Sequence, residues 1–166
     1  MSCLAEPALS CWPSKSNHSI ASVSLNNIGR RYELIEHTAD IGIRAKGRDL
    51  EHLFANAAWA MFDLLAELDS VQIRQSEQIS LAAPNIEELF LVWLSELLYR
   101  YSSREIIYKE FAIKKLTSSS LSAEVKGEGF DLKRHRLKSE IKGVTYHQLK
   151  VQKVKGIWQG EVIFDV

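Results

Sequence analysis

Cysteine is scarce in this chain of 166 residues: Cys3 and Cys11 are its only two, and both lie within the first thirty positions. A disulfide-stabilised scaffold needs cysteines spread over the fold, so the composition argues against one and favours a reducing compartment such as the cytoplasm. No apolar run approaches the roughly 18 residues of a membrane span. We expect no secretory signal, because Glu6 and Pro7 interrupt the only candidate near the start.

Motifs of a self-sufficient catalyst are also missing. The chain contains no Gly-x-Gly-x-x-Gly, no phosphate loop and no Gly-x-Ser-x-Gly nucleophile elbow. It has no Cys-x-x-Cys or His-Glu-x-x-His, so a zinc site built from closely spaced nitrogen and sulfur ligands is not predicted. We therefore expect a protein that is not itself an enzyme.

Charge is balanced overall and uneven locally. The 21 Lys and Arg match the 21 Asp and Glu, but residues 131–155 carry eight basic side chains against two acids, and residues 49–69 carry five acids and no Lys or Arg. Such asymmetry suits contact with another macromolecule, or it reflects two solvated faces. The basic run 133–138 can contact RNA phosphates, although it lacks the interleaved aromatics of a base-stacking surface.

Residues 1–30 differ in composition from the rest. They hold seven serines, two of the three prolines and one acid, so we predict a disordered N-terminal extension followed by one folded domain at 31–166. A transit peptide is the alternative, but the basic residues in this segment are few.

Hydrophobic periodicity in the remaining chain predicts an α+β fold: a mixed β-sheet with two amphipathic helices packed on one face. Asp49 is a suitable N-cap for the first helix, and Asn85 with Glu88 forms a capping box for the second. We expect the Trp and Met residues of both helices in the core. The predicted helices cover residues 50–68 and 86–101, and the predicted strands cover 32–37, 41–46, 71–81, 106–116, 120–128, 140–154 and 157–166.

Two aspartates are candidates for a shared site. Asp40 lies between the first two predicted strands, and Asp165 is next to the terminal carboxylate of Val166 in a tail too apolar to fray readily. Two carboxylates about 4 Å apart would repel by roughly 4 kcal/mol at an effective dielectric near 20, and proteins relieve such repulsion by sharing a proton or binding a cation. Oxygen ligands alone would select calcium or magnesium. An aspartate between strands is also typical of a turn, so both interpretations of Asp40 stay open.

Several segments together resemble the archease family. They are EHTADIG at 36–42, Gly127-Glu128 with Phe130-Asp131 and Arg134-His135, EIKGVTYH at 140–147, and WQGEVIFDV at 158–166. The resemblance covers residues 32–166. The chain departs from the family pattern at Gly143 and Gly160, where alanine is favoured, and at Ser139, where threonine is usual.

This resemblance implies a compact α+β protein that activates an RNA-splicing ligase, the enzyme that joins 3′-phosphate or 2′,3′-cyclic phosphate ends to 5′-hydroxyl ends in tRNA splicing. The activator promotes guanylylation of the active-site histidine of the ligase and helps the ligase turn over. Its partner is therefore a protein, with RNA contacted indirectly and no membrane involved. The alternative is a chaperone or modulator of nucleic-acid-modifying enzymes that acts through its apolar and basic surface.

The resemblance also implies a metal site that takes calcium or a similar hard divalent cation. Carried over by motif, the ligands are Asp40, Asp165 and the backbone oxygen of Val166. Four further residues match motif positions and are expected to line the same polar face: His37, His135, Lys142 and His147.

Overall fold

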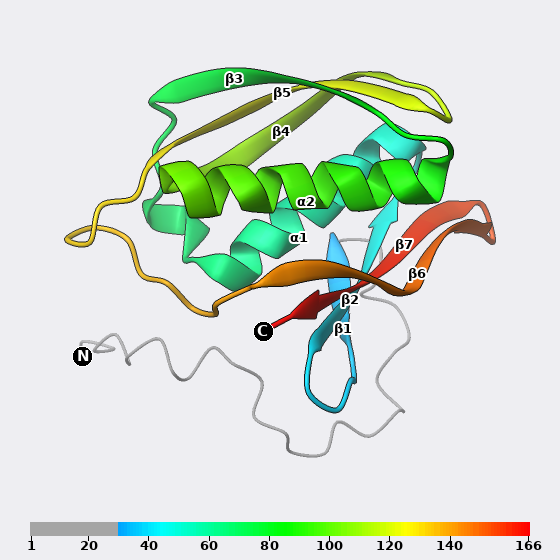
Figure 1. Ribbon diagram of the computed structural model, residues 1–166, viewed down its shortest axis with the longest axis horizontal. Coiled ribbons are helices and arrows are strands. Elements are labelled where there is room, and N and C mark those ends of the chain that lie inside the picture. Colours follow the sequence, from blue (N-terminus) through cyan, green and yellow to red (C-terminus); the bar gives the residue numbers. More distant parts are fainter. Residues whose placement is uncertain (1–29) are drawn as a thin grey trace, which may run out of the picture. The chain divides into compact units, whose positions relative to one another are not determined.

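Two antiparallel sheets lie on either side of a pair of helices in this computed structural model, which describes residues 30–166 (Figure 1). The predicted extension at 1–30 lies outside the described residues except for Arg30, and it stays a prediction. Among the described residues, no helix is both long and apolar enough to cross a bilayer.

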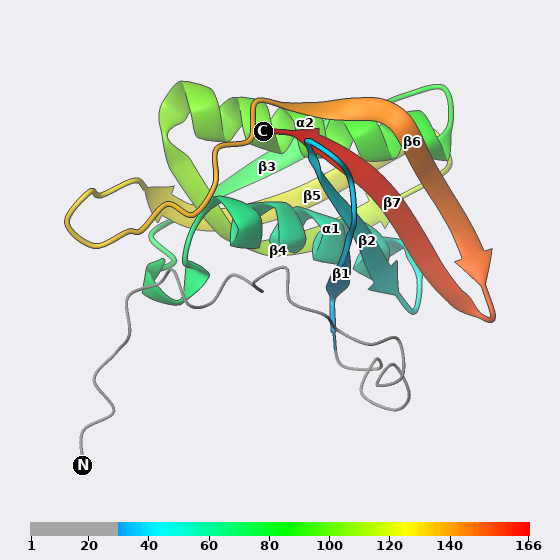
Figure 2. The same cartoon turned by 90° about the horizontal axis from the view of Figure 1, so that it is seen from below.

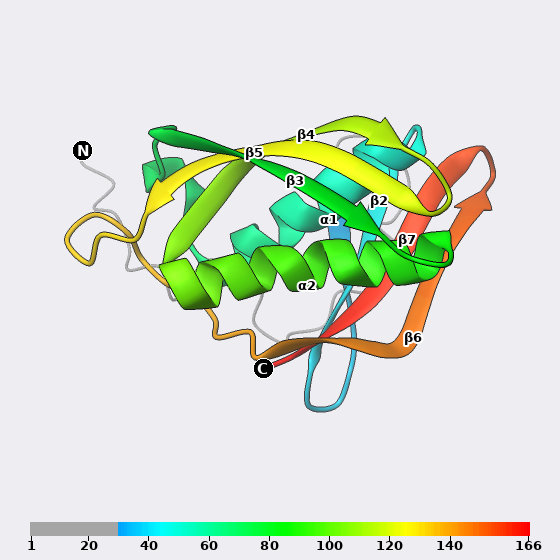
Figure 3. The same ribbon diagram turned by 45° about the horizontal axis from the view of Figure 1, so that its top comes forward.

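The four-stranded sheet has the order β1-β2-β7-β6 and the three-stranded sheet the order β3-β5-β4. Figure 3 shows β3, β5 and β4 running side by side. In chain order the elements are β1 (Tyr32–Ile35), β2 (Ile41–Gly47), α1 (Leu50–Leu65), the 3-10 turn η3 (Leu68–Ser70), β3 (Gln75–Ala82), α2 (Ile86–Arg104), β4 (Ile106–Leu116), β5 (Ser120–Gly129), β6 (Gly143–Val154) and β7 (Ile157–Asp165).

The α+β class with two helices packed against sheet is confirmed, but the single mixed sheet is wrong. Every strand pair is antiparallel, and the strands form two sheets, each of which turns one face toward the helices. Alternation of apolar residues predicts where strands are and leaves their partners open. Here β3 pairs with β5 across the intervening α2 and β4, while β7 inserts between β2 and β6.

Several predicted boundaries also shift: β1 ends at Ile35 instead of 37, α2 ends at Arg104 instead of 101, and β6 begins at Gly143 instead of 140. Two further shifts have a visible cause. Helix α1 ends at Leu65 instead of about 68, because the N–H of Ala66 closes the last turn on Phe62 and Ala66 then bridges to Leu137. Strand β3 begins at Gln75 instead of 71, because the backbone N–H of Gln72 donates to the carboxylate of Glu128 and not to a strand.

Both predicted N-caps are present. The side chain of Asp49 accepts from the N–H of His52 at 2.8 Å, and that of Asn85 accepts from the N–H of Glu88 at 2.9 Å. The carboxylate of Glu88 accepts from the side-chain amide of Asn85 at 3.3 Å. Each cap satisfies a donor that the first helical turn leaves free.

Both helices pack on β7 at Gly160, and this contact sets how closely the strand approaches the helices. A Cβ at Gly160 would lie 2.8 Å from Cζ of Phe90 in α2 and 3.3 Å from Cδ1 of Leu53 in α1. The predicted core is confirmed at Met61 and Trp93, which are fully buried, and the Trp93 indole donates to the Phe54 carbonyl at 3.0 Å. Burial of this aromatic and aliphatic surface is the main favourable term in folding.

Gly127→Ala is expected to destabilise the protein by about 2 kcal/mol or more, because added core volume forces the backbone to move. A Cβ at Gly127 would lie 1.9 Å from the carbonyl oxygen of Ile107, beside the irregularity in the β4–β5 ladder. Gly129→Ala is the matched control, since nothing lies within 4 Å of its Cβ position. Urea unfolding at fixed pH measures both changes, and equal losses of stability would contradict this account of the packing.

Candidate functional site

The pairing of β2 with β7 brings the end of the chain beside its first turn. The last pair of this ladder is Ile41 with Phe164, and one step further along the same register places Asp40 opposite Asp165. Residues directly opposite in an antiparallel pair have Cβ atoms about 4.5–5.5 Å apart. All three views show the turn between β1 and β2 near the C-terminus, and Figure 2 shows it most clearly. The sequence-distant aspartates therefore share one edge of the four-stranded sheet.

The side chain of Asp165 lies on the face of the sheet that points away from the helices. Val162 and Phe164 are fully buried against the helices, so the alternating residues Ile163 and Asp165 face the other way. On β6, Gly143 is paired with Asp165. The N–H of Lys142 donates to the carbonyl of Asp165 at 2.7 Å, which fixes the backbone at the end of β7.

Two histidines lie at the same edge. Nδ1 of His37 is 3.7 Å from Oδ2 of Asp40, and the His37 ring meets the ring of His147 edge-on with centroids 6.2 Å apart. His147 reaches this position through a bulge: residues 146–149 stand opposite the single residue Val162, and Gln148 has φ +56. Bulges commonly re-aim side chains beside functional sites. The structure thus brings His37, Lys142 and His147 to the Asp40–Asp165 edge.

Unpartnered polar atoms concentrate here. Within residues 30–166, only Nδ1 of His37 and Oγ1 of Thr145 are buried side-chain atoms without a hydrogen-bond partner. Thr145 pairs with Ile163 in the ladder between β6 and β7, two residues from the end of that ladder at Gly143 and Asp165. Buried polar atoms are nearly always paired with protein groups or with water, so these two atoms are available to water or to a ligand at this edge. Thr145 was not predicted as a site residue, although it stands in the 140–147 segment that matches the family pattern.

The donor set at this edge fits a hard cation. Asp40, Asp165 and Val166 offer carboxylate and main-chain oxygens, which calcium and magnesium prefer over nitrogen or sulfur. The residues that the structure describes contain no group of three or more His, Cys, Asp and Glu side chains placed to hold a metal. The predicted set has only two such side chains and would take its further oxygens from the end of the chain, so the metal site stays a prediction.

His135 does not lie on this face, which corrects the expectation for that residue. It is 4% exposed, and its Nδ1 accepts from the N–H of Asp131 at 2.9 Å while its Nε2 lies 2.9 Å from the carboxylate of Glu128. Figures 1 and 2 place the 131–138 segment well away from the β1–β2 turn. The position of His135 in the sequence does not indicate that the buried carboxylate of Glu128 binds it.

Glu128 organises that second region. The carboxylate is 2% exposed and is bound by the Arg134 guanidinium at 2.7 and 3.1 Å, by the N–H of Gln72 at 2.7 Å and by Arg74 at 3.1 Å. The hydrogen bond from Arg134, more than any other contact, lowers the pKa of Glu128 to about 2. A buried charge that is fully paired in this way holds its surroundings rigidly and is not free for chemistry.

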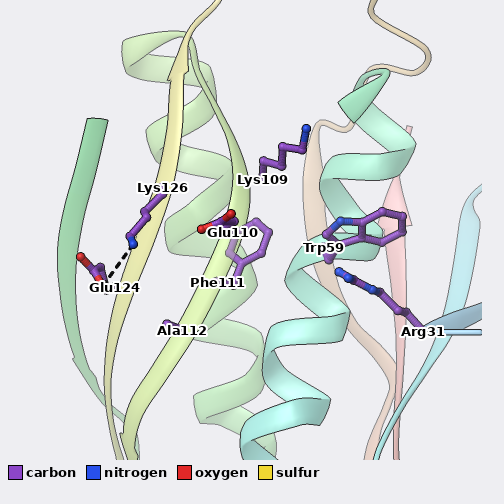
Figure 4. Close-up of a pocket in the computed structure, with 8 residues that line it drawn as sticks. All are labelled: Arg31, Trp59, Lys109, Glu110, Phe111, Ala112, Glu124 and Lys126. Atoms are coloured by element: carbon purple, nitrogen blue, oxygen red, sulfur yellow. Dashed lines mark ion pairs between the residues drawn. The ribbon is translucent and has the colours of Figure 1, made fainter. Parts of the chain in front are cut away.

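A hollow of about 450 Å³ lies elsewhere, and Figure 4 shows the side chains that line it. The Arg31 guanidinium stacks on the Trp59 ring at 4.5 Å on one side, and Lys126 pairs with Glu124 at 3.9 Å on the other. None of the predicted site residues lines this hollow. Its mixed charges do not select a particular ligand.

Comparison with known proteins identifies relatives of the whole folded part. Residues 32–166 match the model of the Archease protein family (MTH1598/TM1083). The chain is 36% identical over 146 residues to protein archease of Methanosarcina barkeri, which covers 86% of this chain and 100% of that one. It is 32% identical over 141 residues to protein archease of Pyrococcus abyssi, covering 82% of this chain and 99% of the relative.

Two solved structures share the fold. The solution structure of Methanobacterium thermoautotrophicum protein 1598 superposes with a TM-score of 0.73 at 29% identity, covering 82% of this chain and 99% of that one. An archease from Thermotoga maritima, described as a possible chaperone, gives a TM-score of 0.52 at 23% identity, covering 80% and 94%. The second likeness bears on the fold alone.

Calcium is expected to raise the melting temperature of the wild-type protein, and EGTA is expected to reverse the rise. A ligand at one hundred times its Kd stabilises the folded state by about 2.7 kcal/mol, which is several degrees for a domain of this size. Asp165→Asn should abolish the rise, whereas Asp69→Asn, at an exposed acid in η3, should keep it. An equal calcium shift in the wild type and in Asp165→Asn would contradict the site.

Glu128→Gln is expected to destabilise the protein at neutral pH and to change its acid response. Because the folded pKa of Glu128 is about 2, below the ordinary value of 4.5 for a glutamate, its stabilising effect is complete above about pH 4.5 and is lost as the pH falls toward 2. The difference in unfolding free energy between wild type and variant should therefore shrink across that window. Urea titrations from pH 7 to 2 measure it, and a constant difference would rule out the ionised, paired Glu128.

Proposed function

This chain is a member of the archease family, and from that premise we propose that it activates an RNA-splicing ligase in tRNA splicing or RNA repair. The activation consists in promoting guanylylation of the ligase and its turnover. The observation that carries the proposal is the β2–β7 register: its last pair is Ile41 with Phe164, and Asp40 and Asp165 are the residues that follow this pair. The protein would act in the cytoplasm, and it would meet RNA only through the ligase.

The composition of the edge suits an activator better than a catalyst. Asp165, Lys142 and His147 are exposed and can be reached by a partner protein, while the Asp40 side chain is 29% exposed. The side chains are carboxylates, imidazoles, one amine and the Thr145 hydroxyl, and that hydroxyl has no hydrogen bond to a base within residues 30–166. Such a set can bind a cation or orient a partner's groups without forming a covalent intermediate.

Each residue at the edge has a distinct part in this proposal. Asp40, Asp165 and Val166 would hold the hard cation, and a bound cation would offset the negative charge of a nucleotide's phosphates at the ligase. Nδ1 of His37 lies 3.7 Å from the Asp40 carboxylate, too far for a hydrogen bond, and would be free to bind a partner's group. The N–H of Lys142 fixes the main chain of Asp165, so the end of β7 is held in place before the partner arrives.

A chaperone or modulator of nucleic-acid-modifying enzymes is the second candidate. It is favoured by exposed apolar side chains, of which Leu132 at 83% is the most exposed. The two functions separate in one assay, because protection of an aggregating client should survive Asp165→Asn, whereas ligase activation should not.

Asp40→Ala is expected to fold normally and to lower stimulated guanylylation of the cognate ligase by about tenfold or more, as expected when one of a few metal-site residues is lost. Normal folding is expected because the Asp40 carboxylate is partly exposed and its 3.7 Å contact with Nδ1 of His37 is too long for a hydrogen bond. Guanylylation with limiting metal is measured with and without the chain, with Asp69→Ala as the control at an exposed acid. Stimulation by Asp40→Ala at the wild-type level would remove the proposed role of this edge.

A further inference from the structure

The 131–138 segment forms a rigid loop that the proposed activation site does not use. We propose that Leu132, Lys133, Arg136 and Leu137, with the neighbouring Arg74, form a docking surface for the same ligase. On the ligase, this surface would contact an apolar recess bordered by carboxylates. We refer to these five residues as the loop surface. The inference rests on the proposed function only in taking the ligase as the partner.

The loop is held at both of its ends and in its middle. At its start, the N–H of Phe130 donates to the carbonyl of Glu105 at 2.6 Å. In the middle, Arg134 and His135 bind the buried carboxylate of Glu128. At its end, the N–H of Lys138 donates to the Leu65 carbonyl at 2.8 Å, which attaches the loop to the last turn of α1. The loop has no regular secondary structure, yet its backbone is fixed by contacts to three other elements.

This fixed backbone presents apolar and cationic side chains to solvent. Leu132 is 83% exposed and Leu137 is 51% exposed. Lys133 and Arg136 are also exposed, and neither forms an ion pair within residues 30–166. The Arg74 side chain is 64% exposed and reaches the same Glu128 oxygen as Arg134, which places it beside the loop. Exposed leucines beside Lys133 and Arg136, two cations without an ion-pair partner in residues 30–166, suit an acidic, partly apolar protein surface.

Rigidity makes this arrangement more effective in binding. Ordering a flexible loop on association costs free energy, whereas a loop that is already fixed avoids that cost. The buried Glu128 pairs with Arg134, His135 and the exposed Arg74, whereas Lys133 and Arg136 take no part in fixing the loop. The side chains of Lys133 and Arg136 stay available for a partner's carboxylates.

The surface fits a protein better than RNA. Sequence-tolerant binding of single-stranded RNA relies on exposed aromatic faces for base stacking. The one aromatic ring in this region, Phe130, is half-buried and packs against His135 with ring centroids 6.0 Å apart. The two exposed leucines have no role in binding phosphates but would fill an apolar recess in a protein.

The loop surface and the Asp40–Asp165 edge lie at separate places on the folded unit (Figure 1). Docking at one place and activation at the other would therefore depend on different residues. Loss of docking should weaken binding without lowering the stimulation reached at saturation. Loss of the Asp40–Asp165 edge should lower the stimulation reached at saturation without weakening binding.

The test uses the full chain and the purified ligase. Binding is measured by biolayer interferometry both without and with RNA, and guanylylation is measured up to a saturating concentration of the chain. The variant L132S/R136E should fold normally, because Leu132 and the Arg136 side chain are exposed and the Arg136 carbonyl keeps its bond from Glu67. It should weaken binding about tenfold or more, with maximal stimulation unchanged. The matched control I157S/K115E, an exposed apolar and an exposed basic residue elsewhere, should bind like the wild type.

The possible failures are distinguishable. Equal affinity of L132S/R136E and wild type would overturn the docking surface and leave the activation proposal intact. A loss of affinity that occurs only with RNA present would show an RNA contact and would also overturn protein docking. A wild-type chain that binds the ligase through the loop surface without stimulating it would overturn the proposed function alone, and a wild-type chain that does not bind the ligase would overturn both.

Discussion

The antiparallel pairing of β2 with β7 is the interaction on which the rest of the structure depends. It sets Ile41 and Ile43 against Phe164 and Val162, and these residues face the two helices. A slip of one residue would turn the buried set toward solvent and the outer set into the core, so the hydrophobic core specifies the register strongly. The same register determines which residue stands opposite Asp165. Packing of the core therefore fixes the geometry of the acidic edge, and the site needs no separate scaffold.

Two groups of charged residues show opposite uses of a carboxylate. Glu128 is buried, receives hydrogen bonds from Arg134, His135 and the Gln72 backbone, and serves only to hold a loop. Asp40 and Asp165 lie together at a partly open edge, beside a histidine nitrogen that has no hydrogen-bond partner in residues 30–166. Satisfied networks stabilise one arrangement, whereas unsatisfied ones have capacity left for a ligand or partner. The first group gives the loop surface its rigidity and the second gives the edge its capacity to bind.

Local features of the fold follow from the sequence because their physics is local. Asp49 and Asn85 act as caps through bonds to residues three positions ahead, and alternation marks most strands within a few residues of their ends. Pairing between distant strands leaves no such local trace, which is why one mixed sheet was expected where two antiparallel sheets exist. His135 shows the same limit, because its contact with Glu128 depends on which side chains the fold buries together and not on their spacing in the sequence. The proximity of Asp40 and Asp165 was expected from the likeness to a family more than from spacing, and the contribution of Thr145 became visible only through its burial.

The central claim is that the start of β2 and the end of β7, which meet at one end of their ladder, hold a hard cation between them. Manganese substitutes for calcium and magnesium at oxygen sites and broadens nearby amide signals in nuclear magnetic resonance spectra. Titration of the ¹⁵N-labelled chain with Mn²⁺ measures the claim directly. The account predicts that broadening begins together at residues 37–42, 142–147 and 163–166, from three separate parts of the sequence. Broadening that begins first around the acids of residues 49–69, with the end of β7 unaffected, would contradict it.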